Sequence, residues 1–209
     1  MTQAPGVGFD LDLTLIDTAP GFGAVLEALG DELGVAFPVA EMVTRLGPPL
    51  DQMLVPHLEP ERIGPAVDRF RVIYPDHAIT TVPALPGAVD AIAAVRRAGG
   101  RVVVVTGKFT PNAQLHLAHL GLDHDHLAGE VWGVGKGDVL RREGCSIYVG
   151  DHVHDVEGAH AAGILSVSVL TGGSTREELL DAGTDVVLDD LTRFPRWYAD
   201  HLAGAGGPV

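Results

Sequence analysis

The chain has 209 residues, enough for one domain with an insertion, and its 46% hydrophobic content excludes wholesale disorder. The formal net charge of −14 argues against nucleic acid or an anionic membrane as a partner, and no apolar run approaches the ~20 residues of a membrane-spanning helix. Cys145 is the only cysteine and residues 1–6 show no features of a signal peptide, so we expect a cytoplasmic protein.

Apolar runs of strand length recur along the chain, and from about residue 85 they alternate with helical patterns. Several runs lack polar alternation, which is typical of strands buried on both faces of a parallel sheet. The pattern predicts an α/β fold with a doubly wound, Rossmann-like parallel sheet. The predicted strands are Val7 to Leu11, Arg101 to Val105, Val131 to Trp132, Ser146 to Val149, Leu165 to Leu170 and Asp185 to Leu188.

Several predicted helices of this part have recognisable ends. Residues 86–98 begin with a proline and are followed by two glycines, the usual asymmetry of a helix. A second helix begins near Thr110 and ends at Gly121. Ser174 and Glu177 have the spacing of a capping box, and Gly183 ends that helix.

The segment between residues 18 and 84 has a different pattern. It contains helical stretches broken by prolines and no convincing strand. The sequence therefore predicts a discontinuous core domain of residues 1–17 and 85–209, with an all-helical domain of residues 18–84 inserted after the first strand. The predicted helices of the insert are Gly21 to Leu33, Val39 to Leu46, Leu50 to His57 and Glu61 to Ile73.

Polar side chains follow three of the predicted strands, at the edge where an open parallel sheet binds its ligands. Crowded carboxylates repel one another unless a cation joins them, and hard oxygen ligands with open positions suit Mg²⁺. A lysine and a threonine hydroxyl beside such a metal can hold phosphoryl oxygens. The residues point to phosphoryl chemistry. They are Asp10 and Asp12, Thr106, Gly107 and Lys108, and Asp151 and Asp155.

Four motifs in chain order resemble those of the haloacid dehalogenase-like hydrolase superfamily. Residues 9–18 match the D-x-D-x-T-L-x-D pattern, and residues 102–108 form a strand that ends in threonine. Lys136 fits the third motif, and residues 150–155 fit G-D-x-x-x-D. The sequence is most similar to the phosphoglycolate-phosphatase-like branch, whose helical type 1 cap corresponds to the insert.

The resemblance implies a role for each carboxylate. Asp10 would be the nucleophile that forms an aspartyl-phosphate, and Asp12 would act as general acid and base. The implied metal ligands are Asp10, the backbone carbonyl of Asp12, and Asp151. Asp155 would act through water or by orienting Lys136.

The chain has only two lysines, Lys108 and Lys136, and the resemblance gives them different roles. Lys136 would neutralise charge on the nucleophile and the phosphate, although the proline that usually follows this lysine is absent. Lys108 competes for that role; we expect it instead at the entrance, screened by water and facing the cap. Thr106 and the backbone N–H of Gly107 would hold the phosphoryl group. Arg45 resembles the cap position where related enzymes place substrate-selecting groups, or it is a solvated arginine at a helix end.

The resulting hypothesis is a Mg²⁺-dependent phosphatase, a phosphoric monoester hydrolase acting on a small phosphorylated metabolite of the phosphoglycolate type. It would be a monomer or a homodimer. A phosphosugar mutase of the β-phosphoglucomutase type shares every core residue and stays open as an alternative. A dehalogenase would lack Asp12 and need no metal, and a non-catalytic phosphoacceptor or regulatory module is disfavoured by the chain length and the intact core residues.

Other chemistry-bearing residues are given ordinary roles. Cys145 is expected to be a small buried hydrophobe. His152 and His154 are expected beside the site or on the surface, because Mg²⁺ prefers oxygen ligands. A further group of histidines is interpreted as a solvated helix end: His116, His119, His124 and His126.

Overall fold

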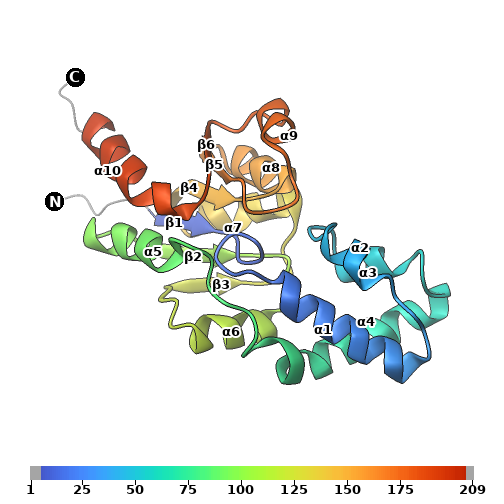
Figure 1. Cartoon of the computed structure of the whole chain (residues 1–209). Helices are drawn as coiled ribbons and strands as arrows, with labels where there is room; N and C mark the ends of the chain where they lie inside the picture. Colours follow the sequence, from blue (N-terminus) through green and yellow to red (C-terminus); the bar gives the residue numbers. More distant parts are fainter. Residues whose placement is uncertain (1–5, 206–209) are drawn as a thin grey trace.

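The computed structural model describes residues 6–205, so the expectation about the N-terminal segment falls largely outside the described residues. Within this range the centre is a six-stranded parallel sheet in the order β3-β2-β1-β4-β5-β6 (Figure 1). The predicted α/β fold with a doubly wound sheet is confirmed. The strands are β1 (Gly6–Phe9), β2 (Val102–Val105), β3 (His126–Ala128), β4 (Cys145–Gly150), β5 (Leu165–Val169) and β6 (Val186–Leu188).

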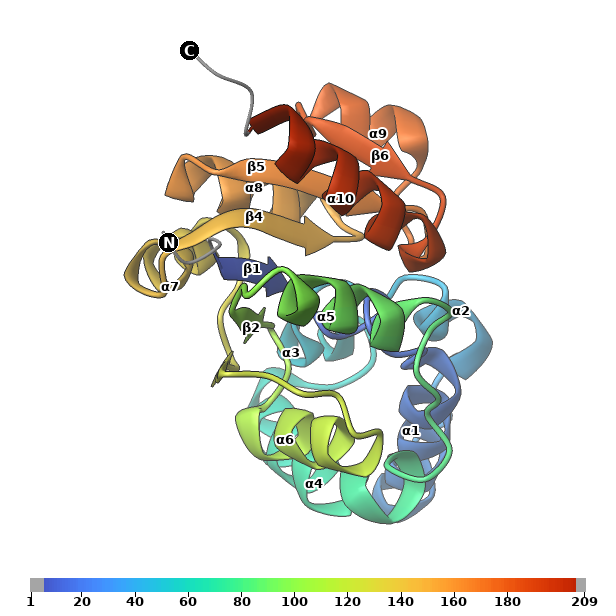
Figure 2. The same ribbon diagram turned by 90° about the vertical axis from the view of Figure 1, so that its left-hand side faces the viewer.

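Helices cover both faces of the sheet, as the uninterrupted valines of β2 require. Val102 and Val104 belong to the large core, which also contains buried side chains of α5 (Ala88–Arg97) and α10 (Phe194–Ala205). Val103 and Val105 point to the opposite face and pack in a second core. The helices of the second face are α7 (Lys136–Arg142) and α8 (Val153–Ala162), visible behind the sheet in Figure 2. The remaining helices of this part are α6 (Thr110–His119) and α9 (Arg176–Asp181), with 3-10 turns at Gly133–Gly135 and Leu191–Arg193.

Two local predictions were wrong. Residues 131–132 are not a strand, because β3 lies earlier and its residues 126–128 pair with β2. The capping box of α9 is one residue later than predicted: Thr175 Oγ1 accepts from the Glu178 N–H, and Glu178 accepts from the Thr175 N–H. Ser174–Glu177 and Thr175–Glu178 have the same spacing, but α9 begins at Arg176, which makes Thr175 the residue that caps the helix.

The insert contains four helices and no strand between residues 19 and 78, all of which the structure describes. The longest helix continues through Pro65 and Pro75, beyond its predicted end at residue 73. The first and last helices pack against each other, with the Phe22 and Phe70 ring centroids 5.3 Å apart. The helices are α1 (Ala19–Leu33), α2 (Val39–Val43), α3 (Leu50–Leu54) and α4 (Pro60–Ala78).

Two chain crossings join the insert to the sheet, and they lie side by side. The Asp17 N–H donates to the Pro83 carbonyl at 3.0 Å, and the Leu85 N–H donates to the Leu15 carbonyl at 2.9 Å. Figure 1 shows the four helices grouped to one side of the sheet. The division into domains at residues 17/18 and 84/85 stays a prediction. No helix among the described residues is both long and apolar enough to cross a membrane.

Candidate active site

The loop after β1 turns sharply and presents two carboxylates, Asp10 and Asp12. At its tip Leu13 has φ +57°, a left-handed conformation that bulky residues rarely adopt. The Thr171 hydroxyl donates to the Leu13 carbonyl at 2.6 Å and ties this loop to the one after β5. The Thr14 hydroxyl donates to Asp151 Oδ1 at 2.7 Å. The loop is thus held in place by the ends of neighbouring strands.

Three buried carboxylates meet at the carboxyl end of the sheet. One oxygen each of Asp10, Asp151 and Asp155 lies within 4.8 Å of the other two. Burial raises the pKa of Asp10 to about 7; Lys136 opposes this rise and Asp155 adds to it. Burial and the charges of Asp155 and Asp10 also raise the pKa of Asp151. Without a metal ion, Asp10 and Asp151 therefore resist ionisation.

The cluster has the properties that Mg²⁺ requires. Asp10 Oδ1 is buried and lacks a hydrogen-bond partner; Lys136 Nζ is 3.3 Å away but outside hydrogen-bonding geometry. The loop after β5 approaches so closely that a Cβ on Gly172 would overlap Asp151 Oδ2. Hard carboxylate oxygens with one unpartnered oxygen fit a small oxygen-seeking cation. The cluster joins the two carboxylates implied as direct ligands, Asp10 and Asp151, with Asp155. The side chain of Asp12, of which only the backbone carbonyl is an implied ligand, points toward Lys108.

Lys136 lies directly beside these carboxylates. It begins α7, and the preceding glycines form a 3-10 turn that leads into this helix. Its side chain is only 1% exposed, and Nζ is 2.6 Å from Asp155 Oδ1. Burial alone would lower the pKa of Lys136, but Asp10 and Asp155 raise it above its usual value. Lys136 is therefore a fixed cation at the nucleophile candidate.

Tyr148 is a positioning residue that the sequence analysis missed. It lies in the buried strand β4, where its hydroxyl accepts from Lys136 Nζ at 2.9 Å and donates to the Val105 carbonyl at 2.6 Å. Asp155 completes the support, because its second oxygen accepts from the backbone N–H groups of Asp151 and His152, each at 3.1 Å. A buried tyrosine in a parallel strand needs a hydrogen-bond partner for its hydroxyl, and this requirement is the feature of the sequence that could have indicated Tyr148.

Lys108 contradicts the prediction that it faces solvent at the entrance. Its side chain is 8% exposed, and Nζ is 2.9 Å from Asp12 Oδ1. The ring of Tyr74 on α4 covers it, with Nζ 4.5 Å from the ring centroid. Thr18 also donates to Asp12. Burial would raise the pKa of Asp12, but Lys108 outweighs this effect and lowers it.

Replacing Lys108 with methionine is expected to lower the free energy of unfolding at neutral pH by about 2 kcal/mol. The value is below the ~3–5 kcal/mol of fully buried pairs because the Asp12 side chain is 30% exposed. The lowered Asp12 pKa stabilises the wild type above the unperturbed value of 3.8, and this contribution is lost as the pH falls through the folded-state pKa. The variant's deficit should therefore persist down to about pH 3.8 and shrink only at a second pH well below that value.

Urea unfolding at neutral pH and at a pH well below 3.8 measures how much the stability deficit of the variant changes. Arg196→Met is the matched control, because it removes a cation whose side chain is 93% exposed. An equal deficit for Lys108→Met at both pH values would show that lost packing, rather than the charge pair, is responsible.

His116 also departs from its predicted place on a solvated helix end. It is fully buried, and its Nε2 is 3.0 Å from the Tyr74 hydroxyl. Burial and the Lys108 charge lower the pKa of His116 to about 4, so it is neutral at pH 7. The reason is α4, which packs over α6 and closes what the sequence suggested was an open helix end. Cys145 is buried, as expected.

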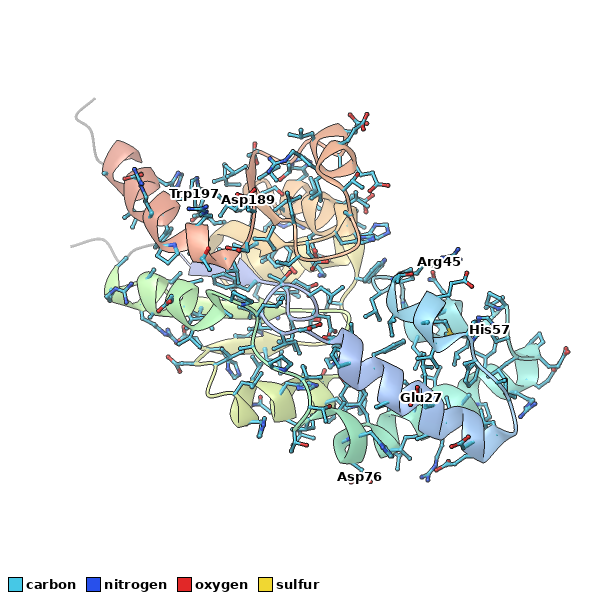
Figure 3. The ribbon with its side chains drawn as sticks, in the orientation of Figure 1. Glu27, Arg45, His57, Asp76, Asp189 and Trp197 are labelled. Atoms are coloured by element: carbon cyan, nitrogen blue, oxygen red, sulfur yellow. The ribbon has the colours of Figure 1, made fainter. Side chains whose placement is uncertain are left out.

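The residues predicted to bind substrate differ in their placement. Thr106 is fully buried at the end of β2, and its hydroxyl accepts from the Lys108 N–H at 3.3 Å. Gly107 follows it, and both line the cavity above the carboxylates. Arg45 does not line this cavity. Its side chain is 74% exposed and pairs with Glu41 at 3.0 Å, and Figure 3 shows it at the edge of the insert. The solvated-arginine interpretation therefore fits.

A cavity of about 420 Å³ lies between the insert and the carboxyl end of the sheet. Its floor contains the carboxylates and Thr106. Its walls contain side chains of the insert and of the loops after β2 and β3. His152 and His154, predicted beside the site or on the surface, are half-buried and line it. Such a cavity could admit a small ester and bring its phosphoryl group to Asp10.

Comparison with known proteins relates the chain to the haloacid dehalogenase-like hydrolases. A family model described as haloacid dehalogenase-like hydrolase matches residues 7–160, and one described as HAD-hydrolase-like matches residues 138–194. A phosphoglycolate phosphatase of Caulobacter vibrioides is 29% identical, over 91% of this chain and 89% of that protein. The tyrosine-protein kinase PtkA of Mycobacterium tuberculosis is also 29% identical, over 86% of this chain and 66% of that protein.

Solved structures share the fold. A haloacid dehalogenase-like hydrolase of Streptococcus pneumoniae superimposes with a TM-score of 0.82 and 24% identity, covering 95% of this chain and 100% of that one. The first family model covers the loop after β1, the end of β2, the start of α7 and the end of β4, which together supply the site. The chain therefore belongs to the haloacid dehalogenase-like hydrolases, on their phosphoglycolate-phosphatase-like branch.

Proposed function

We propose that this hydrolase is a Mg²⁺-dependent phosphatase that hydrolyses a small phosphomonoester through an aspartyl-phosphate on Asp10. The observation that carries the proposal is the buried Asp10 carboxylate, which has one unpartnered oxygen, a fixed ammonium 3.3 Å away and two further carboxylates beside it. The relatives named phosphoglycolate phosphatase support phosphomonoester chemistry.

In the first step an Asp10 oxygen attacks phosphorus in line with the ester oxygen. The new bond joins Asp10 to phosphorus, and the bond from phosphorus to the ester oxygen breaks. Asp12 gives its proton to the leaving oxygen; it would be protonated in the enzyme–substrate complex, where the negative phosphoryl group opposes the effect of Lys108 on its pKa. In the second step Asp12 takes a proton from water, whose oxygen attacks phosphorus. The bond to Asp10 breaks, inorganic phosphate leaves, and both aspartates regain their starting forms.

The surrounding residues hold the phosphoryl group during both steps. The Thr106 hydroxyl and the Gly107 N–H would donate to its oxygens, and Lys136 would neutralise part of its charge. Mg²⁺ held by Asp10, the Asp12 carbonyl and Asp151, and supported by Asp155, would supply further charge neutralisation. Tyr148 and Asp155 keep Lys136 in place, so its ammonium needs no reorganisation when the reaction begins.

Removal of Mg²⁺ is expected to abolish activity, and its return is expected to restore it. Binding of the metal itself should weaken as the pH falls below about 7, because burial raises the pKa of Asp10 to that value and protons then compete with the cation. Calorimetry in two buffers with different heats of ionisation measures Mg²⁺ affinity and proton release independently of turnover.

Asp151→Asn should lose both Mg²⁺ binding and activity. Asp138→Asn, whose side chain is 83% exposed on α7, should keep both. Full activity in a thoroughly chelated sample would contradict the proposal and favour metal-free dehalogenase chemistry.

No observation favours a phosphosugar mutase over a phosphatase. The intact set of acid, base and lysine candidates does not support a non-catalytic phosphoacceptor. The domain boundaries, the cytoplasmic location and the monomeric or homodimeric state stay predictions.

A further inference from the structure

The described residues that line the cavity offer no uncommitted lysine or arginine for a second anionic group of the substrate. Apart from histidines, the described residues that line it include two cations, Lys108 and Arg71. Lys108 pairs with Asp12, as described above. Arg71 on α4 is 3.3 Å from Glu130, and its guanidinium lies 4.6 Å from the centroid of the Phe109 ring. Both cations are held by partners within the protein.

Apart from Arg71, the charged residues that the insert contributes to the cavity wall are acidic. Asp51 on α3 and Asp68 on α4 line the cavity and are solvent-exposed. A carboxylate on the substrate would find no uncommitted lysine or arginine among the described lining residues, and these aspartates would add only a weak repulsion. Because both aspartates are exposed, water screens them, and they would give a substrate amine only weak attraction.

Aromatic side chains are concentrated around this cavity. The chain contains six Phe, three Tyr and two Trp, and the aromatic residues on the cavity wall are Phe22, Phe70, Tyr74, Phe109 and Trp132. Trp132 also stands 4.9 Å from the His154 ring and 5.8 Å from the His152 ring, centroid to centroid. The volume of about 420 Å³ lies within the ~300–1,000 Å³ of pockets that hold drug-sized ligands. A two-carbon glycolate group would fill little of it.

Building on the proposed function, we propose that the substrate is a phosphomonoester whose alcohol part is an uncharged aromatic group rather than a carboxylate-bearing one. Its phosphoryl group would lie on Asp10, and its ring would lie against Trp132 and Phe109. Aromatic rings pack favourably edge-to-face or offset against such walls, and an uncharged ring needs no cation.

The test is a set of esters with similar alcohol leaving groups, assayed for kcat/KM with saturating Mg²⁺. Benzyl phosphate should exceed both 4-carboxybenzyl phosphate and 2-phosphoglycolate by about tenfold or more. It should exceed cyclohexylmethyl phosphate by about 2- to 10-fold, because that ester keeps the apolar bulk but lacks the π-system. A preference for 2-phosphoglycolate or for phosphoethanolamine would overturn the inference while leaving the phosphatase intact. Absence of hydrolysis of every ester would instead contradict the proposed function.

A variant pair locates the ring. Trp132→Ala should raise KM for benzyl phosphate about tenfold and leave KM for methyl phosphate nearly unchanged, and Trp132→Phe should largely restore the benzyl value. Val134→Ala is the matched control, because Val134 is in the same connection and 67% exposed. Equal losses on both esters in Trp132→Ala would show that the indole only supports the loop, and the assignment of the ring to this wall would then be wrong.

Discussion

Replacing Asp10 with asparagine is expected to lower kcat by on the order of 10⁴-fold or more, because an amide is a poor nucleophile and no other carboxylate can take its place. Asp151 and Asp155 share the cluster, but Asp155 is occupied by Lys136 and two backbone N–H groups, and Asp151 accepts from Thr14. Steady-state release of inorganic phosphate measures the loss. Activity within tenfold of wild type would contradict the mechanism.

The same substitution should leave the protein folded. Burial raises the pKa of Asp10 from 3.8 to about 7, so the metal-free wild type loses stability as the pH rises through this interval. Asparagine cannot ionise, and the metal-free variant should therefore be at least as stable as wild type at pH above about 7. Thermal unfolding in the presence of a chelator, with Asp138→Asn as the exposed control, separates this effect from lost activity.

Replacing Lys136 with methionine is expected to lower kcat by about 10²-fold or more, which is typical of removing one preorganised charge donor. The substitution should also lower the free energy of unfolding by about 3 kcal/mol at neutral pH, because the buried Asp155 carboxylate loses the ammonium that it pairs with. Steady-state kinetics well below the melting temperature, together with urea unfolding, measure both effects.

Lys108→Met provides the comparison for that prediction. Its cation contacts Asp12 rather than the Asp10 cluster, so its kcat defect should be smaller than that of Lys136→Met. A large kcat loss at Lys108 with little change at Lys136 would show that the two lysines have been assigned in reverse.

The carboxylate cluster could be predicted because its information is local. Asp10 and Asp151 each come directly after a buried apolar strand, and parallel strands present their carboxyl ends at one edge. No tertiary detail is needed to place them together. The same reasoning places Thr106.

The surroundings of Lys108 could not be predicted in this way. Its burial depends on the Tyr74 ring of α4, a helix of the insert whose packing over the sheet edge has no local signal. His116 is buried by the same tyrosine. Residues 131–132 were wrongly predicted as a strand because two consecutive apolar residues are enough to resemble a short strand. The residues that pair with β2 are 126–128. Errors of this kind depend on contacts between distant segments.

Trapping the phosphorylated protein tests most directly whether the phosphoryl group passes through Asp10. Wild-type protein mixed with benzyl phosphate and Mg²⁺ and quenched in acid within the first turnover should carry the added mass of one phosphoryl group. Peptide mapping should place that mass on Asp10, and the adduct should be absent from Asp10→Asn. An adduct on another residue, or phosphate release by Asp10→Asn at the wild-type rate, would contradict the account.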